Sequence, residues 1–134
     1  IARPLVQYRR HDANDSSLTA DTSRFAREVA RAMQRQKSTT TICTANGIDA
    51  PPEDVLRGSW YVLQLRIASM RLLPERHPLP GDSRGKALLD TFRNLLGTGC
   101  EPLKRRVLLT GWSLATILAP KPLAAGLIRR KFRG

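Results

Sequence analysis

The spacing of hydrophobic and polar residues predicts a chain of helices behind one short strand. Residues 4 to 10 are rich in strand formers and predict a strand, and residues 11 to 18, dense in Asp, Asn and Ser, predict a loop. Beyond residue 20, apolar side chains recur every three or four positions, which is the period of an amphipathic helix. We therefore predict a mainly α fold: one N-terminal β-strand, then a bundle of about five helical segments.

The first predicted helix begins at a cap, Asp21 or Thr22, and runs to about Lys37. Its narrow apolar face repeats every four residues, at Phe25, Val29 and Met33. Residues 39 to 49 hold three consecutive threonines and an Asn-Gly pair but no helical period. We interpret them as a linker or an irregular turn.

The second predicted helix starts at Pro51-Pro52 and ends at Pro74, because proline fits the first turn of a helix and breaks its interior. It carries the widest apolar stripe of the chain, formed by Val55, Leu56, Trp60, Val62, Leu63, Ile67, Met70 and Leu73. We expect this helix to be the longest and the most buried. His77 follows among prolines and is interpreted as a turn residue.

Three more helical segments are predicted after this turn. Asp82 or Ser83 caps a helix that Gly97 closes. Its apolar stripe is expected at Ala87 or Leu88, Phe92, and Leu95 or Leu96. Another helix begins near Glu101-Pro102, and Pro120-Lys121-Pro122 separates it from a short amphipathic segment over residues 123 to 132.

Residues 107 to 119 carry no charged side chain, and two interpretations of this run stay open. The run is shorter than the roughly 20 residues that span a bilayer, and it has the length of a buried core helix. As an interfacial helix, it would place Trp112 at the level of lipid headgroups. Basic side chains would then meet anionic lipid: Arg105, Arg106, Arg129, Arg130 and Lys131.

The net charge of the chain limits the classes of partner that we expect it to bind. A net charge of +12, from 23 Lys and Arg against 11 Asp and Glu, favours anionic lipid, nucleic acid or a phosphorylated substrate. Charge spread over a chain is equally typical of solvated surfaces. The 134 residues open on Ile1 without a signal-peptide pattern, which we interpret as a cut end, and Cys43 and Cys100 lie in no metal-binding spacing.

One short motif carries a family resemblance. Residues 8 to 14 read Tyr-Arg-Arg-His-Asp-Ala-Asn, of the form Tyr-Arg-x-His-x-x-Asn, after the apolar pair Leu5-Val6. This resembles the segment that closes the catalytic domain of many bacterial family 2 glycosyltransferases of the GT-A type. The helices behind it, the Pro-Lys-Pro break and the basic end are also similar to that family.

The resemblance implies a role for each matching residue. Arg9, Arg10 and His11 would bind the diphosphate of the sugar donor, and His11 would also complete the coordination of a divalent metal, Mg or Mn. Because side chains alternate along a strand, only one of the two arginines should reach the site. Asn14 would shape the loop.

The resemblance also implies an organisation. Residues 1–18 would be the last strand and loop of a GT-A α/β catalytic domain, and residues 19–134 a C-terminal helical region with a basic amphipathic tail. The parent enzyme would transfer a sugar from a nucleotide-sugar donor to a glycan or lipid-linked acceptor, in the cytoplasm or on the inner face of the plasma membrane. An upstream half would bind most of the metal, so this fragment alone is expected to be inactive.

A different class of function stays as the alternative, a small basic helical module that binds nucleic acid or an anionic membrane. Nucleic acid is not the expected partner, because the seven aromatic residues are not interleaved with the basic ones as a stacking platform.

Overall fold

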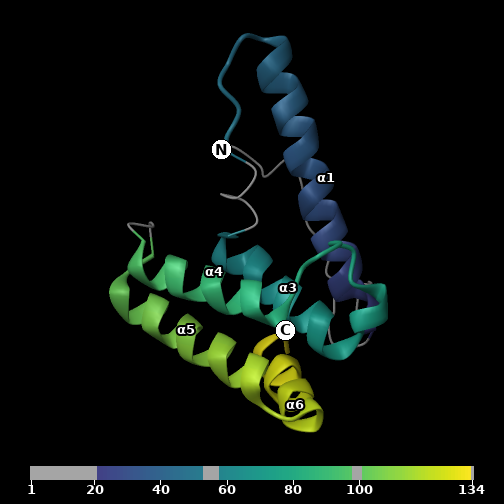
Figure 1. Cartoon of the computed structure of the whole chain (residues 1–134), viewed down its shortest axis with the longest axis vertical. Helices are drawn as coiled ribbons and strands as arrows, with labels where there is room; N and C mark the ends of the chain where they lie inside the picture. Colours follow the sequence, from purple (N-terminus) through teal and green to yellow (C-terminus); the bar gives the residue numbers. More distant parts are fainter. Residues whose placement is uncertain (1–20, 53–57, 98–100, 134) are drawn as a thin grey trace, which may run out of the picture.

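The computed structural model describes residues 21–52, 58–97 and 101–133, and these residues form a helical body with one projecting helix (Figure 1). The elements in order are α1 (Ser23–Ala45), α3 (Trp60–Leu72), the 3₁₀ helix η1 (Pro74–Arg76), α4 (Arg84–Leu96), α5 (Leu103–Leu118) and α6 (Lys121–Lys131). The predicted mainly α class is confirmed. The strand and loop predicted for residues 4 to 18 lie outside the described residues.

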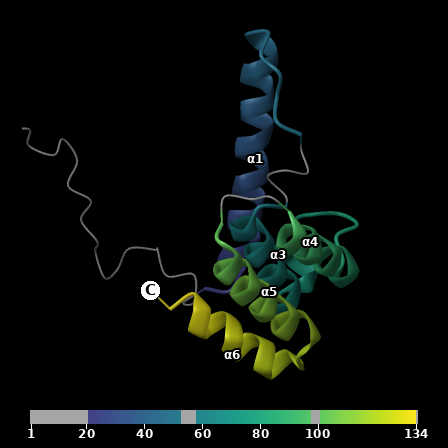
Figure 2. The ribbon, with the colours of Figure 1, turned by 90° about the vertical axis from the view of Figure 1, so that its left-hand side faces the viewer.

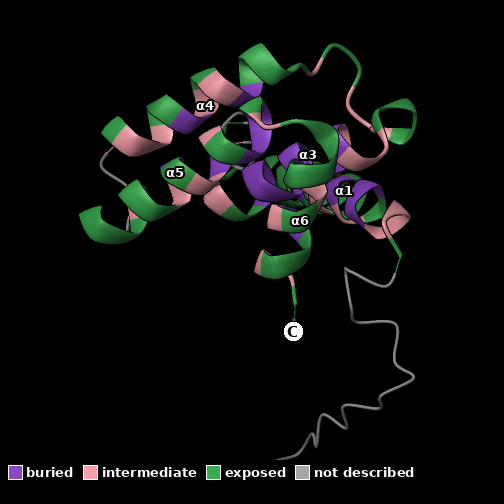
Figure 3. Cartoon of the chain, turned by 90° about the horizontal axis from the view of Figure 1, so that it is seen from below, coloured by how far each residue is buried: buried purple, intermediate pink, exposed green. Residues whose placement is uncertain are grey.

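Helix α3 is the centre of the body, because α1, α4, α5 and α6 all pack against it. All residues from Val62 to Ser69 are buried, and the buried residues gather along α3 and the facing part of α1 (Figure 3). Two apolar clusters divide its surface. One joins Phe25, Val29, Leu65, Ala68 and Ile128, and the other joins Leu63, Ile67, Ala87 and Ile117.

The prediction that this helix is the most buried is confirmed, but the prediction that it is the longest is wrong among the described helices. Helix α1 has 23 residues and α3 has 13. The predicted start at Pro51-Pro52 also differs. The described helix has Ser59 as its N-cap, whose side chain accepts a hydrogen bond from the amide of Val62 at 3.4 Å.

The linker predicted for residues 39 to 49 is wrong for most of its length, because α1 continues to Ala45. The hydroxyls of Thr39 and Thr41 donate to the carbonyls of Arg35 and Lys37 at 3.0 Å, so the threonines bond within the helix. The second half of α1 stands out from the body formed by α3 to α6 (Figure 2). Its side chains are mostly exposed.

The predicted ends of α4 and α5 are confirmed, whereas α6 (Lys121–Lys131) begins two residues before its predicted start at residue 123. Ser83 caps α4 by accepting a hydrogen bond from the amide of Lys86 at 3.2 Å, and Gly97 is its C-cap. Helix α5 starts after Pro102 and stops at Leu118, and Pro120 is the N-cap of α6. Local capping chemistry thus sets these boundaries.

The predicted buried stripe of α4 is wrong at Phe92, which is 46% exposed. Of the alternatives Leu95 and Leu96, Leu95 is half-buried and Leu96 is 82% exposed. Ala87 and Thr91 occupy the buried positions instead. Two polar contacts on that same face explain the rotation of the helix. Asp90 accepts a hydrogen bond from Arg66 at 2.8 Å, and the side-chain amide of Asn94 donates to the carbonyl of Gly58. Residues 87, 90, 91 and 94 share one face at helical spacing.

Candidate functional site

The residues that the sequence assigns to a sugar-nucleotide site lie outside the described residues. These are Arg9, Arg10, His11 and Asn14. Their roles therefore stay predictions, including the metal ligation by His11. Within the described ranges, no group of three or more His, Cys, Asp or Glu is placed to hold a metal ion.

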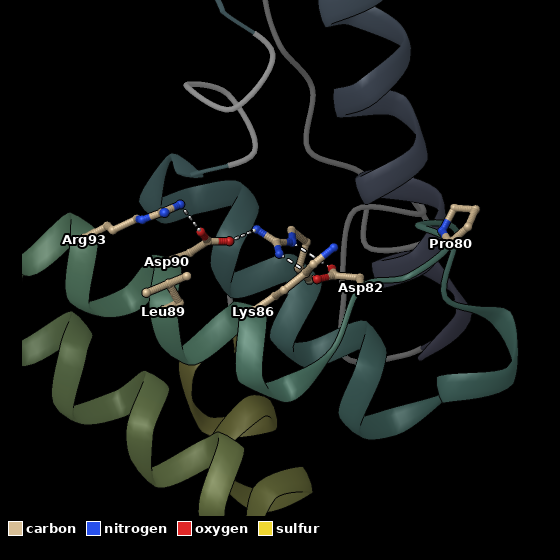
Figure 4. A pocket seen from close by; sticks show the side chains of 7 residues that line it. Pro80, Asp82, Lys86, Leu89, Asp90 and Arg93 are labelled. Atoms are coloured by element: carbon tan, nitrogen blue, oxygen red, sulfur yellow. Dashed lines mark hydrogen bonds and ion pairs between the residues drawn. The ribbon is translucent and has the colours of Figure 1, made fainter.

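A buried ionic cluster is the most elaborate polar site of the described residues. It consists of Arg66 and Ser69 from α3, His77 and Asp82 from the following turn, and Asp90 from α4. Arg66 donates from Nε and Nη2 to the two oxygens of Asp82 at 2.8 and 2.7 Å, and from Nη1 to Asp90 at 2.8 Å. The Asp90 carboxylate lies between the guanidinium groups of Arg66 and Arg93 (Figure 4).

The charged groups of this cluster stabilise one another in their ionised forms. Burial alone would raise the pKa of the Asp82 carboxyl, but hydrogen bonds from Arg66 and His77 outweigh it and hold that pKa well below its usual range. Burial likewise opposes the charge of Arg66, yet its bonds to Asp82 and Asp90 raise the pKa of the guanidinium. The pair is therefore ionised inside the body, where the planar fork of arginine satisfies both carboxylates.

Ser69, His77 and Asp82 are joined in the order of a nucleophilic triad. The imidazole Nδ1 lies 3.0 Å from the Ser69 hydroxyl, and Nε2 lies 3.0 Å from the Asp82 carboxylate. Ser69 is only 1% exposed and sits within α3, so no substrate carbonyl can approach its hydroxyl. The ring nitrogens are also exchanged relative to the serine hydrolase arrangement, in which Nε2 faces the serine. This chain of hydrogen bonds therefore fastens the turn after α3 to the body.

His77 differs from its prediction as a simple turn residue. Its side chain is buried and bonded at both ring nitrogens, to Ser69 and to Asp82. The proline-rich sequence around it gives no sign of this, because its partners are five and eight residues away.

A pocket opens beside the cluster, and Pro80, Lys86, Leu89 and Arg93 line its rim (Figure 4). Asp82 and Asp90 form part of its floor together with Arg66. The two carboxylates are already neutralised by arginine, and the rim adds two basic side chains. Charged side chains of both signs therefore line this pocket, and its two carboxylates are paired with Arg66 or Arg93.

The six residues predicted to contact a membrane divide into two groups. Arg105, Arg129 and Arg130 are exposed, although Arg105 lies 3.2 Å from Glu101. Arg106 turns toward the preceding connection, where its Nη1 donates to the carbonyls of Leu95 and Gly97. Trp112 and Lys131 also turn inward.

Trp112 is a packing residue of the body. It lies against both apolar clusters, and its ring meets that of Phe132 edge to face at 6.2 Å between centroids. Lys131 places its ammonium 4.8 Å from the centroid of the same indole. Burial and the nearby charge of Arg105 lower the pKa of this lysine. Both side chains are half-buried against the body, whereas the interfacial interpretation requires Trp112 to face outward.

The outward side of α5 is apolar, whereas its inward side is largely small and polar. Thr110, Ser113 and Thr116 are buried in the body. We define the outer apolar surface as the exposed large side chains of α5 and the start of α6: Leu103, Val107, Leu108, Leu118 and Leu123. The uncharged run thus fits neither open interpretation completely, because only one of its faces is core. A helical wheel of residues 103 to 118 places these two faces on opposite sides of the helix. This pattern could have predicted the surface from the sequence.

Comparison with known proteins identifies no relative of this chain. No protein-family model, no curated protein and no solved structure matches this chain. Within the described ranges, none of the helices combines the length and the apolar character needed to cross a bilayer. The family resemblance therefore depends on residues 8 to 14 and on the helical organisation that follows them.

Proposed function

We propose that this chain is the C-terminal part of a family 2 glycosyltransferase that acts in cell-surface polysaccharide synthesis. The parent transfers a sugar from a nucleotide-sugar donor to a glycan or lipid-linked acceptor. The observation that carries the proposal is the Tyr-Arg-x-His-x-x-Asn pattern of residues 8 to 14, directly ahead of a helical region. The basic end after the break at Pro120 supports it as well.

The proposed chemistry of the motif is charge stabilisation. Departure of a nucleoside diphosphate develops negative charge on the leaving oxygens, and a guanidinium from Arg9 or Arg10 would bind them with its planar fork. His11 would stand at the same diphosphate and ligate a bound Mg or Mn ion, which supplies Lewis-acid stabilisation. The Asp-x-Asp motif and the base for the acceptor hydroxyl are assigned to the upstream half.

The parent enzyme provides the test. Its upstream sequence should alternate strands with helices and contain an Asp-x-Asp motif. His11→Ala should lower turnover by roughly a hundred- to a thousandfold, as removal of one charge-stabilising contact does, while circular dichroism stays unchanged. Near-normal turnover of His11→Ala at saturating donor and metal would show that the site assignment is wrong.

Arg9→Ala and Arg10→Ala form a matched pair within the motif. Neighbouring residues of a strand face opposite sides, so one variant should raise the KM for the donor and the other should leave it near wild type. Asn14→Ala should act through the loop and change donor binding less than His11→Ala does. Equal behaviour of both arginine variants would contradict a strand at this position.

A basic binding module is the second candidate function. One observation favours it: residues 102 to 133 contain eight Lys and Arg and no Asp or Glu. Such a one-sided charge attracts polyanionic surfaces. Binding of the chain to DNA and to anionic vesicles, measured side by side, tests this candidate and separates its two partners.

A further inference from the structure

We propose that the outer apolar surface of α5 and α6 docks on the surface of an anionic lipid bilayer. The inference does not rest on the proposed glycosyltransferase, since it concerns only residues 103 to 133. It assigns the lipid-facing role to leucines that face away from the body, in place of Trp112 and Arg106, which face into it.

The first support is the exposure of large apolar side chains on one side of a well-formed helix. In α5, Leu108 is 65% and Leu118 is 72% exposed, while Ser113 and Thr116 are fully buried. A helix that only covers a core places its leucines inward and its hydroxyls outward. In α5, Trp112 and Ile117 pack into the body, but Leu108 and Leu118 are left for a partner outside it.

The surface continues from α5 onto the start of α6, and the two residues that connect the helices, Ala119 and Pro120, are uncharged. A groove between the end of α5 and the start of α6 is lined by Ala115, Leu118, Pro122, Leu123 and Gly126, with Arg130 at its edge. Between the leucines, this surface carries the small residues Gly111, Ala115 and Gly126, whose side chains are absent or too short to project from it. Exposed residues accordingly run along the outer side of both helices (Figure 3).

The second support is the charge around this surface. Lys104, Lys121, Arg129, Arg130 and Arg133 are exposed on α5, on α6 or directly after it. No acidic residue occurs between positions 102 and 133, and within the described part of the chain none of these five side chains forms an ion pair. Basic side chains beside an exposed apolar face are the pattern of helices that lie in the interface of an anionic membrane.

A bilayer fits this combination better than the other possible occupants. A second copy of the chain would bring the same eight basic residues against the first, because a twofold contact pairs identical surfaces. Nucleic acid would bind the basic residues but offers no apolar partner for the leucines. An anionic bilayer offers both, with glycerol and acyl groups for the leucines and charged headgroups for Lys and Arg.

Vesicle co-sedimentation of the 134-residue chain tests the proposal. The chain should pellet with phosphatidylcholine vesicles that contain phosphatidylglycerol and much less with phosphatidylcholine alone, and sodium chloride should weaken the binding. Leu108→Ser and Leu118→Ser should each lower the vesicle affinity by about tenfold, because each removes one leucine from the buried contact. Both side chains are exposed, so the fold should persist.

Gly111→Glu is the sharper variant, with a matched control. A Cβ atom added at Gly111 has no heavy atom within 4 Å apart from its chain neighbours and its own helix backbone, so the exposed position has room for a carboxylate side chain. It should abolish binding, whereas Gly111→Ala should bind like wild type. Thr40→Glu adds the same charge on the exposed half of α1 and should leave binding nearly unchanged.

Four outcomes would overturn the proposal. These are no binding to anionic vesicles, equal loss of binding for Gly111→Glu and Thr40→Glu, salt-sensitive DNA binding without vesicle binding, and dimers that the leucine variants dissociate in the absence of vesicle binding. None of these results depends on sugar transfer. The activity of the His11→Ala parent tests that function separately.

Discussion

Arg66 and Asp82 face each other through two parallel hydrogen bonds, at 2.8 and 2.7 Å, with only 3% of each side chain exposed. The pair joins the middle of α3 to the residue just before the N-cap of α4. A buried charge that loses its partner is strongly destabilising, whereas exposed ion pairs contribute little. The pair therefore fixes the path of the chain between the two helices.

Removal of one charge from this pair should destabilise the fold. We expect Asp82→Asn to lower the free energy of unfolding by about 3–5 kcal/mol, because the Arg66 charge stays buried with Asp90 as its remaining anion. Urea denaturation measures the loss. Asp21→Asn breaks an exposed pair with Arg27 and should leave the midpoint close to wild type. Equal midpoints for the two variants would contradict the role of the buried pair.

The same carboxylate predicts sensitivity to acid. The pKa of Asp82 is lower in the folded chain than the value of about 3.9 in the unfolded chain. Its contribution to stability is thus complete above about pH 5 and is lost as the pH falls through the unfolded pKa toward the folded one. Urea midpoints measured below pH 5 should fall less steeply for Asp82→Asn than for wild type. Parallel curves would exclude Asp82 as a cause.

Two neighbouring residues test the orientation of α5. Ile117 is buried in a core cluster and Leu118 is exposed. Ile117→Ala should lower the free energy of unfolding by about 2–5 kcal/mol, and Leu118→Ala should change it by no more than about 0.5 kcal/mol. Thermal or urea unfolding gives both values. A larger loss for Leu118→Ala would mean that the helix is turned the other way.

The length of α1 can be tested with proline. Thr40→Pro should reduce the helical signal at 222 nm and the amide protection of residues 37 to 45, because proline removes a hydrogen bond and clashes with the preceding turn. The urea midpoint of the body should change little, since the side chains near Thr40 are exposed. Thr40→Ala is the control and should keep or raise helicity. An unchanged helical signal in Thr40→Pro would favour the linker interpretation.

Local chemistry made several boundaries predictable from the sequence. Ser83, Gly97 and Pro120 were each identified because a cap or a proline acts within one turn of its own position. The end of α1 was missed for a related reason. Threonine is a weak helix former, but in α1 the hydroxyls of Thr39 and Thr41 bond to carbonyls one turn earlier, which a propensity argument does not anticipate.

Contacts between residues far apart in the sequence determine the features that the local sequence pattern does not predict. The rotation of α4 depends on Asp90 reaching Arg66, 24 residues away, and this polar contact overrides the apolar pattern that favoured Phe92. The absence of charge in residues 107 to 119 does not predict the outer surface of α5, because the exposed and the buried face of the helix are both uncharged over this run. The motif at residues 8 to 14 remains a sequence prediction, since it lies outside the described residues.

The central position of α3 has a consequence during synthesis on the ribosome. Of the described helices that cover α3, only α1 precedes it in the chain, and α4, α5 and α6 are all made later. Until α6 leaves the exit tunnel, Leu65 and Ala68 lack their contact with Ile128, and until α5 leaves it, Ile67 lacks its contact with Ile117. The nascent chain therefore exposes these apolar side chains of α3 until α5 and α6 have left the tunnel, and a chaperone at the tunnel exit can bind them during that interval.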